Sequence, residues 1–368
     1  MAEWIIEGHP EWDLWRLDVR RFGTNYASQD YILDRTIETY TKYYDIHYPG
    51  EERMSGRNLR LSPTYTRLRE MGAFFGERSG WERVNYMKSY ESLARHGHEP
   101  KGWAHHNWSR AIGYEHLMTR KTAGMFDETS FNKFEVSGPG ALGFLNHVCA
   151  NQIDRPVGTI VYTQCLNSRG GIECDFTVTR LEEQKFLIIT GTAFGKHDSS
   201  WLRINMPEDG SVTLEDVSSS NACIGLWGPK SRQILSKVTK ADISNDGFPY
   251  MTAKYLTVGN VPVLASRVTY VGELGWEFYC PMEYGLQLWD ALWEAGKPEG
   301  VVAAGYKAIE SLRLEKGYRY WSAEISPDYT PLEAGLGFAV DFEKEDFIGR
   351  EMLLKQKQVG LKQRLCCL

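Results

Sequence analysis

Residues 158–180 contain the side chains of this sequence that are best suited to chemistry on a small ligand. The stretch places Tyr162 and Asn167 before a Gly-Gly turn and Asp175 after it, where an apolar strand is expected to begin. A carboxylate in such a run is costly to desolvate unless a cation or a group rich in N–H donors meets it. Asp175 is therefore a candidate for chemistry on a nitrogen-rich ligand, although an exposed strand start explains the same spacing equally well.

Two other charged residues occupy regular elements expected later in the chain. Glu277 lies between Trp276 and Phe278 in an alternating stretch, where an outward-facing position on a half-buried hairpin is the simpler interpretation. Arg313 lies in an expected helix, where a surface ion pair worth about 0–1 kcal/mol is the simpler interpretation. Each signal is weak alone and gains value only from the order in which these residues occur together.

The remaining motifs that could carry chemistry are weaker still. No G-x-G-x-x-G follows an expected strand, so the chain lacks the fingerprint of a dinucleotide-binding fold. His105 and His106 are expected to be solvated rather than metal ligands, because no acidic residue or cysteine lies at ligand spacing. The sequence therefore predicts no metal site.

The composition is that of an ordinary globular chain. Its 368 residues leave room for two or three domains, and 42% are hydrophobic and 24% charged. A net charge of −6 argues against a large nucleic-acid surface. The seven cysteines are scattered without a C-x-x-C pair, which is typical of a reducing compartment. No apolar run reaches the roughly 20 residues that span a bilayer, and no signal peptide is visible.

The elements expected around these residues mix helices and strands. Periodicity predicts helices near 31–44, 141–149, 282–295 and 303–316, and apolar or alternating runs predict strands at 134–136, 186–190, 267–270 and 276–280. The last two strands flank residues 272–275, which give a hairpin signal, and the polar stretch at 86–110 is the best candidate for a linker. Because strands and helices follow no strict βαβ order, the sequence favours an α+β fold.

From about residue 115 to 358 the sequence resembles the folate-binding part of the glycine-cleavage T-protein (aminomethyltransferase) family. Six segments carry the resemblance in the order found in that family: 124–131, 158–180, 270–277, 310–315, 330–336 and 347–350. Such a series, spread over most of the chain, is a specific signal and implies a T-protein-like folate-binding domain.

Residues 10–85 resemble the central segment of the FAD-dependent dimethylglycine and sarcosine dehydrogenases, through the segments 13–15, 18–23, 48–53, 56–57 and 80–83. In those enzymes a flavin domain comes first, this segment follows as a bridge, and a T-protein-like half comes last. The resemblance implies a bridge at 1–90, a linker at 91–112, a folate-binding domain at 113–340 and the start of a truncated C-terminal barrel at 341–368. FAD is then expected only on a flavin-binding half that is missing from this chain.

The resemblance also implies roles for individual residues. Asp175 would orient and polarise the amine of tetrahydrofolate while its nitrogen attacks the carbon of an iminium. Glu277, with Glu273 as the runner-up, would accept the N–H groups of the pterin ring. Tyr162 and Tyr320 would stack on the pterin and benzoyl rings. Arg313 would pair with the glutamate tail, and Asn167 would make one further polar contact.

The function implied is one-carbon transfer to tetrahydrofolate within an oxidative N-demethylase like dimethylglycine or sarcosine dehydrogenase. Its partners would be folate and an iminium, or formaldehyde, that derives from an N-methyl amine, and its location the bacterial cytoplasm or the mitochondrial matrix. Two alternatives stay open: a non-catalytic relative similar to the regulatory subunit of pyruvate dehydrogenase phosphatase, and a folate-dependent O- or S-demethylase. The bridge at 10–85 argues against the second, since such demethylases have no need of it.

Overall fold

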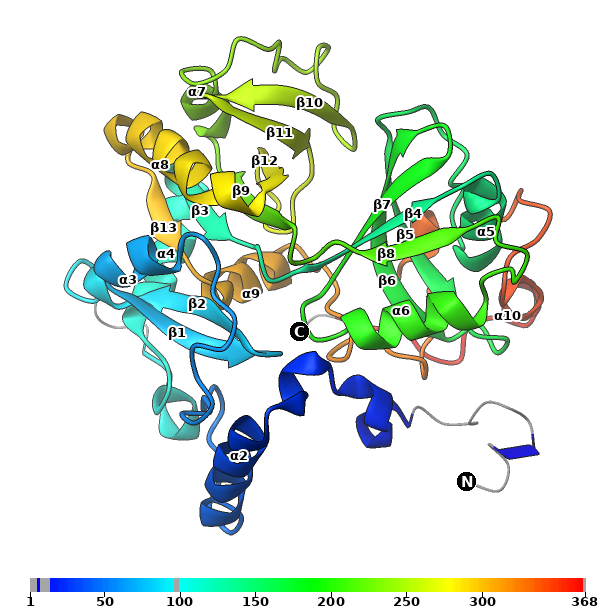
Figure 1. Cartoon of the computed structure of the whole chain (residues 1–368), viewed down its shortest axis with the longest axis horizontal. Helices are drawn as coiled ribbons and strands as arrows, with labels where there is room; N and C mark the ends of the chain where they lie inside the picture. The colour runs from blue at the N-terminus through cyan, green and yellow to red at the C-terminus, as the bar shows by residue number, and fades with distance from the viewer. Residues whose placement is uncertain (1–4, 7–13, 96–98, 367–368) are drawn as a thin grey trace. The chain divides into compact units, whose positions relative to one another are not determined.

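The computed structural model describes residues 5–6, 14–95 and 99–366. It divides into two compact units, each assembled from separate stretches of the chain. The first unit comprises Met1–Phe22, Asn132–Val217 and Arg319–Leu368, and the second comprises Gly23–Phe131 and Ser218–Tyr318. Each unit contains one large sheet, whose strands are labelled in Figure 1.

The first unit is built on a five-stranded antiparallel sheet with the order β5-β6-β7-β4-β8. Its strands are β4 (Asn132–Ser137), β5 (Ile160–Leu166), β6 (Ile172–Glu182), β7 (Lys185–Thr190) and β8 (Thr213–Asp216). The longest of them, β6, pairs with β5 on one side and with β7 on the other. It therefore lies inside the sheet, where its side chains are placed by two neighbours.

Alternation along β6 decides which of its side chains reach the core. The apolar residues of β6 pack with residues of α5 (Ala141–Val148) and α6 (Gly195–Ile204) in one buried cluster: Cys174, Phe176 and Val178 from the strand, Leu145 and Leu202 from the helices. Asp175 and Thr177 alternate with these residues. Both therefore lie on the opposite face of the sheet.

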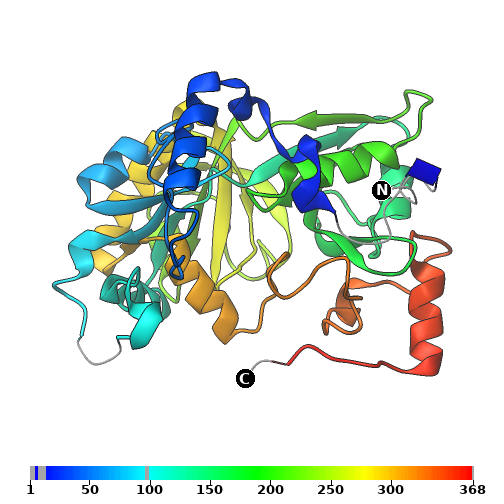
Figure 2. The same ribbon diagram turned by 90° about the horizontal axis from the view of Figure 1, so that it is seen from below.

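The end of the chain completes the first unit. It contains η8 (Gly337–Ala339) and α10 (Arg350–Val359), which is drawn in red at the edge of this unit in Figures 1 and 2. The indole N–H of Trp321 donates to the carbonyl of Ile172 at 3.0 Å. The amide of Ile172 in turn donates to the carbonyl of Tyr329 at 3.0 Å. Both backbone groups at the start of β6 are thus held by this last segment.

The second unit is built on a six-stranded sheet with the order β10-β11-β12-β9-β3-β13. Its strands are β3 (Gly124–Asp127), β9 (Asn221–Trp227), β10 (Ala253–Val258), β11 (Val261–Ser266), β12 (Gly275–Pro281) and β13 (Val302–Ala304). Neighbouring strands are antiparallel except for β13 with β3. The neighbours β3 and β9 come from the two separate stretches of chain that form the unit.

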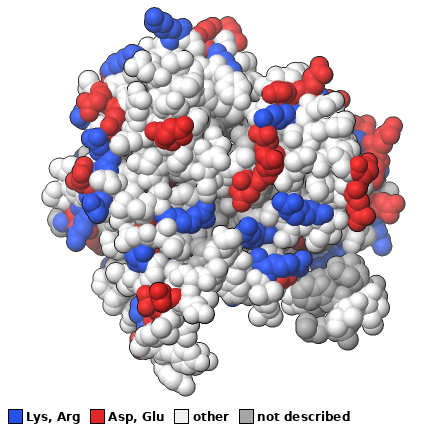
Figure 3. Space-filling view, in the orientation of Figure 1, with Lys and Arg blue, Asp and Glu red and all other residues white. Residues whose placement is uncertain are grey.

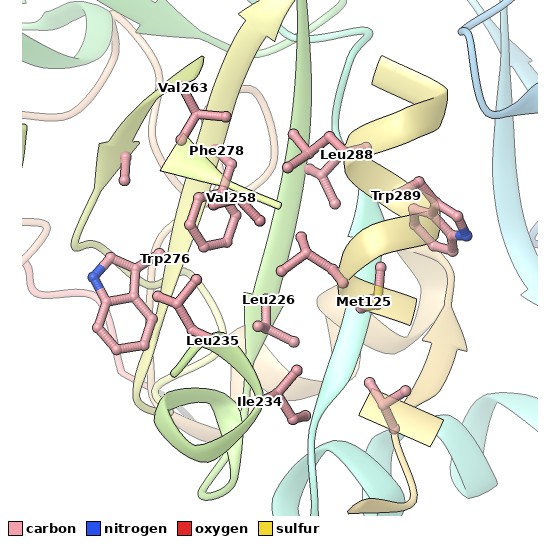
Figure 4. Packing of buried hydrophobic residues seen from close by; sticks show 14 of the residues in the cluster. Met125, Leu226, Ile234, Leu235, Val258, Val263, Trp276, Phe278, Leu288 and Trp289 are labelled. Carbon is pink, nitrogen blue, oxygen red and sulfur yellow. The ribbon is translucent and has the colours of Figure 1, made fainter. Parts of the chain in front are cut away.

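Helices pack on both faces of this sheet. On one face, α7 (Ser231–Leu235) and α8 (Gly285–Gly296) close a large apolar cluster, in which Figure 4 shows Trp276 and Phe278 of β12. On the other face, α9 (Tyr306–Glu315) packs on Phe126 and Trp227. Because side chains alternate along β12, Glu277 lies on the face of α9.

The N-terminal part of the second unit adds α2 (Gln29–Thr41), α3 (Tyr65–Glu70), α4 (Arg110–Lys121) and the hairpin of β1 (Ala73–Arg78) and β2 (Trp81–Met87). The buried carboxylate of Glu115, on α4, accepts from the amides of Met87 at 2.5 Å and Gly305 at 2.9 Å. Glu115 thereby ties β2, α4 and the start of α9 together. Besides η8, the described residues form the short 3-10 helices η1 (Trp15–Leu17), η2 (Val19–Arg21), η3 (Thr24–Ala27), η4 (Lys88–Tyr90), η5 (Gly102–His105), η6 (Met282–Tyr284) and η7 (Lys297–Glu299).

The structure confirms the α+β class and most of the expected elements, among them β4, β7, β12, α5, α8 and α9. The strand predicted at 267–270 is wrong, since β11 ends at Ser266 and a loop follows. The loop is wound around Thr269, whose hydroxyl accepts from the amides of Val271, Gly272 and Glu273. These local bonds replace the ladder that the alternating pattern had suggested.

Several boundaries differ from the prediction. The helices predicted at 282–295 and 303–316 begin later, because 282–284 form η6 and 303–304 belong to β13. Residues 86–87 of the predicted linker end strand β2. The helix predicted near 31–44 exists as α2, but its apolar residues Ile32 and Ile37 are 46% and 54% exposed.

Charged side chains of both signs are interspersed over the face shown in Figure 3. This face offers no continuous basic surface of the kind that a nucleic-acid backbone requires. In the described part of the chain, no helix is both long and apolar enough to cross a bilayer.

Candidate functional site

Asp175 lies on β6 directly opposite Gln164 of β5. The side-chain amide of Gln164 donates to the carboxylate of Asp175, with Nε2 2.9 Å from Oδ1. Tyr162 lies two residues before Gln164 on the same strand, so its side chain belongs to the same face of the sheet. Asp175 is half-buried, which contradicts the alternative of an exposed strand start.

The surroundings of Asp175 make its carboxylate a base near neutral pH. Removal from water raises the pKa of Asp175 to about 6, and the nearby charge of Asp198 acts in the same direction. Hydrogen bonds with Gln164 and Tyr162 favour the charged form and limit the rise of this pKa. A carboxylate with such a pKa is ionised at pH 7 and can still take up a proton from a reacting group.

The two tyrosines expected to frame an aromatic ligand lie in the same unit as Asp175. The ring of Tyr162 stacks near that of Phe338, with centroids 6.1 Å apart, and Phe338 is 75% exposed. Tyr320 lies edge-on to Phe194 at 6.3 Å. Both tyrosines are half-buried, a position that leaves part of an aromatic ring available to a ligand.

Asn167 shapes the turn that leads into β6. Its side-chain oxygen accepts from the amides of Arg169 and Gly171, both at 3.0 Å, and its side-chain nitrogen donates to Glu173 at 2.9 Å. The turn also requires Gly171, because a Cβ there would collide with the carbonyl of Pro327. The predicted contact of Asn167 with folate stays a prediction, while these bonds indicate a role in the turn itself.

Beside Glu173 lies a buried histidine that sequence reasoning missed. Nδ1 of His197 is 2.8 Å from Asp198, and Nε2 is 3.6 Å from Glu173. Burial alone lowers the pKa of His197, but the two carboxylates outweigh this effect and raise the pKa to about 9. His197 is therefore a cation at neutral pH, held between α6 and β6. Its only signal in the sequence is the dipeptide His197-Asp198, which says nothing of Glu173.

Glu277 lies on β12 opposite Ser266 of β11 and Gly225 of β9. The hydroxyl of Tyr279, two residues further along the strand, donates to the carboxylate of Glu277. Glu128 and Cys223 offer further ligand atoms, all within 4.8 Å of one another and of the Glu277 carboxylate. Two carboxylates thus converge on one region of this sheet, where they can accept N–H groups of a ligand. Sequence reasoning missed Glu128, because only strand pairing brings it to Glu277.

Glu273 and Arg313 are both engaged in ionic contacts. Glu273 pairs with Arg120 at 2.9 Å, and Arg120 also donates to the carbonyl of Val271 at 2.6 Å. Arg313 is only 2% exposed; it pairs with Glu310 and donates to the carbonyl of Tyr318 at 3.0 Å. The interpretation of Arg313 as a surface ion pair therefore does not hold, since its guanidinium is buried.

The predicted site residues are distributed over both units. Asp175, Tyr162, Asn167 and Tyr320 belong to the first unit, and Glu277, Glu273 and Arg313 belong to the second. In the first unit, Asp175 and Tyr162 share one face of the sheet. In the second, Glu277 lies on the face that α9, the helix of Arg313, covers.

Comparison with known families identifies the family of the chain. Residues 64–344 match the family model of the GCVT N-terminal domain, and residues 7–62 match that of the FAD dependent oxidoreductase central domain. The chain therefore belongs to the GCVT family, and within it to the proteins that carry an FAD dependent oxidoreductase central domain. The resemblance seen in the sequence is confirmed.

Two individual relatives match nearly the whole length of this chain. The chain is 35% identical to the mitochondrial sarcosine dehydrogenase of Mus musculus, over 100% of its own length and 44% of that protein. It is also 35% identical to the mitochondrial pyruvate dehydrogenase phosphatase regulatory subunit of Mus musculus, over 99% of its length and 42% of that protein. It thus spans less than half the length of these relatives.

A solved structure supports the same fold. The glycine cleavage system aminomethyltransferase T from Bartonella henselae superposes with a TM-score of 0.68 and 26% sequence identity. The similarity covers 82% of this chain and 76% of that structure.

Proposed function

We propose that this chain carries out folate-dependent one-carbon transfer, as the T-protein-like part of an oxidative N-demethylase related to sarcosine and dimethylglycine dehydrogenases. The observation that carries the proposal is the carboxylate of Asp175, which is half-buried, hydrogen-bonded by Gln164 and given a pKa of about 6. It lies in a chain of the GCVT family. A base of this kind is what proton removal from an amine at neutral pH requires.

In the proposed reaction, tetrahydrofolate supplies the secondary amine that accepts the one-carbon unit of an iminium or of formaldehyde. Asp175 orients this amine and accepts the proton that it loses when its lone pair bonds to the carbon. The same carboxyl group then gives the proton to the departing amine or hydroxide, so protons balance over the cycle. Gln164 holds the carboxylate in place through its amide. Positioning of amine and electrophile together supplies much of the rate.

The donor set fits a reduced folate. The pterin edge presents several N–H groups, and Glu277 offers it a carboxylate that lies near a second one, Glu128. Glu277 is the better candidate than Glu273, whose carboxylate is already paired with Arg120. The roles of Tyr162 and Tyr320 in stacking, of Arg313 toward the glutamate tail and of Asn167 as a polar contact complete the proposal.

FAD fits the described residues poorly. Within 14–95 the sheet structure is the antiparallel hairpin of β1 and β2. A dinucleotide site needs parallel strands joined through a helix with a glycine-rich turn, which this hairpin does not provide. We therefore assign FAD to a part of the full-length protein outside this chain. We also propose that the protein is located in the bacterial cytoplasm or the mitochondrial matrix.

Calorimetric titration of the chain with 5-formyl-tetrahydrofolate tests the binding step. Glu277→Gln is expected to weaken binding by about tenfold or more, because a charged acceptor of N–H groups is lost. Glu273→Gln is the matched control, since it removes the same charge from a carboxylate held by Arg120, and its affinity should stay within about twofold. Absence of binding by the folded wild-type chain would contradict the proposal.

The alternative is a non-catalytic regulatory protein, favoured by the similarity to the pyruvate dehydrogenase phosphatase regulatory subunit. A transfer assay separates the two functions, with formaldehyde and tetrahydrofolate as substrates. The enzyme is expected to accelerate their condensation, and Asp175→Asn to abolish the acceleration. Folate binding without any acceleration would favour regulation. Acceleration only with methyl ethers or thioethers as donors would favour the O- or S-demethylase.

A further inference from the structure

Gln164 is buried opposite Asp175 with one polar atom left over. The residue has no exposed surface, and its Nε2 donates to Asp175. Its Oε1 has no hydrogen-bond partner among the described residues. Buried polar atoms are nearly always satisfied, so an exception calls for a physical reason.

A purely structural glutamine would be energetically unfavourable at this position. An unsatisfied buried acceptor loses its hydration without compensation, and leucine would fill a similar volume without that cost. Cys165, the residue after Gln164 on β5, faces the apolar core, whereas the side chain of Gln164 lies on the same face of the sheet as Asp175. The amide is therefore aimed at Asp175, whose pKa burial raises to about 6.

We propose that the hydrogen bond of Gln164 changes with the protonation state of Asp175. While Asp175 is ionised, the amide of Gln164 donates to the carboxylate; when Asp175 is protonated, the amide turns over and accepts from the carboxylic acid. This inference rests on the proposed function and deepens it. Among side chains without charge, a carboxamide offers both strong donors and a strong acceptor on one planar group. The two states differ by half a turn about the last side-chain torsion, which is broad and two-fold.

The orientation of the amide follows from the charge of its partner. While Asp175 is ionised, Nε2 must face it, because Oε1 in that place would bring two acceptors together. When Asp175 has taken a proton from the substrate amine, its O–H needs an acceptor, and Oε1 is the atom without a partner. No covalent bond to Gln164 is made or broken; the proton stays on Asp175 until it passes to the leaving group.

Other groups around Asp175 do not replace this role. Tyr162, from β5, stabilises the ionised form by a hydrogen bond, and Asp198, from α6, disfavours it by its charge. Glu173, on the same strand, is held by Asn167 and His197. None of these three is the residue directly opposite Asp175, and none offers a donor and an acceptor on one planar amide as Gln164 does.

The test combines a titration with kinetics on the full chain. Gln164→Leu removes both the donor and the acceptor of the amide and places an apolar side chain of similar size in the same buried position. The matched control is Gln184→Leu, the same replacement at the exposed turn between β6 and β7. Carboxyl carbon NMR, with Asp175→Asn to assign the signal, follows the protonation of Asp175 without any ligand.

Gln164→Leu is expected to raise the titration midpoint of Asp175, to move the acid limb of one-carbon transfer upward by the same amount, and to lower the maximal rate about tenfold or more. The control should change none of these. An unchanged midpoint, or an unchanged rate at the optimal pH, would overturn the inference. If the wild-type chain neither binds folate nor accelerates transfer, the proposed function fails. The NMR titration then still decides whether Gln164 responds to the charge of Asp175.

Discussion

At the scale of single residues, carboxylates of the same chemical type take different roles because their neighbours differ. Asp175 is bonded by an uncharged amide and keeps a pKa of about 6. Glu273 is paired with Arg120. Asp198 lies against the imidazole of His197. The neighbour of Asp175 is an uncharged amide, and burial raises the pKa of this carboxyl group toward neutral pH, where it can exchange a proton.

Keeping Asp175 ionised costs stability. Its pKa in the folded chain, about 6, lies above the ordinary value of 3.8. The group therefore favours folding below pH 3.8, and this contribution is lost as the pH rises through 6. Asp175→Asn is expected to raise the free energy of unfolding by about 1–3 kcal/mol at pH 7 and to change it little at pH 4.

Urea unfolding at the two pH values checks this expectation. Asp246→Asn, at an exposed position, is the control and should have little effect at either pH. A less stable Asp175→Asn protein at pH 7 would show that the carboxylate stabilises the fold instead.

At the scale of elements, the parts governed by local pattern could be predicted, and those governed by distant partners could not. The alternation of Asp175 with Phe176 identifies strand β6 and the face of its carboxylate. The pattern at 267–270 looks alike, but Thr269 captures the neighbouring amides and a loop results. Gln164, His197 and Glu128 were missed, because only register and helix packing bring them to the residues that the motifs identify.

Lys344 makes a contact between elements that no sequence motif predicts. Its ammonium group donates to the carbonyls of Asn146, Cys149 and Asn151, which lie at and beyond the end of α5. Lys344→Met is expected to lower the free energy of unfolding by about 2–4 kcal/mol, because the carbonyl of the buried Cys149 and two half-buried carbonyls lose their donor. Chemical unfolding measures this, with Lys355→Met on the exposed side of α10 as the control. Equal stabilities of the two variants would refute the role of Lys344.

His197 connects α6 with the turn before β6, through Glu173 and Asn167. Its folded pKa of about 9 lies above the ordinary 6.5, so its contribution to stability is complete below pH 6.5 and is lost as the pH rises through 9. We expect wild-type stability to fall by about 2–3 kcal/mol across this window and the fall to be absent in His197→Gln. Unfolding curves at several pH values, compared with His47→Gln at an exposed site, decide this. The same slope in both variants would exclude His197 as its source.

At the scale of the whole molecule, segments that are neighbours in a unit are often far apart in the sequence. Each unit combines stretches that lie far apart in the sequence. Trp321 bonds to Ile172, and Trp15 packs against His197, across more than a hundred residues in each case. Local periodicity carries no information on such pairs. The linear domain boundaries predicted at 90, 112 and 340 stay predictions, because they follow from resemblance and not from these contacts.

Removal of residues 319–368 tests how far the first unit depends on its last segment. The deletion takes away Trp321, Ile325, Phe347 and Leu353 from a buried cluster that also contains Ile172. It removes both backbone partners of Ile172 as well. Because Ile172 begins the strand of Asp175, the shortened chain is expected to lose protection of β6 amides from hydrogen exchange, and folate binding with it. Amides of β9, in the second unit, should keep more of their protection. If β6 remained as protected as in the full chain, the end of the chain would be dispensable for the strand that carries the proposed base.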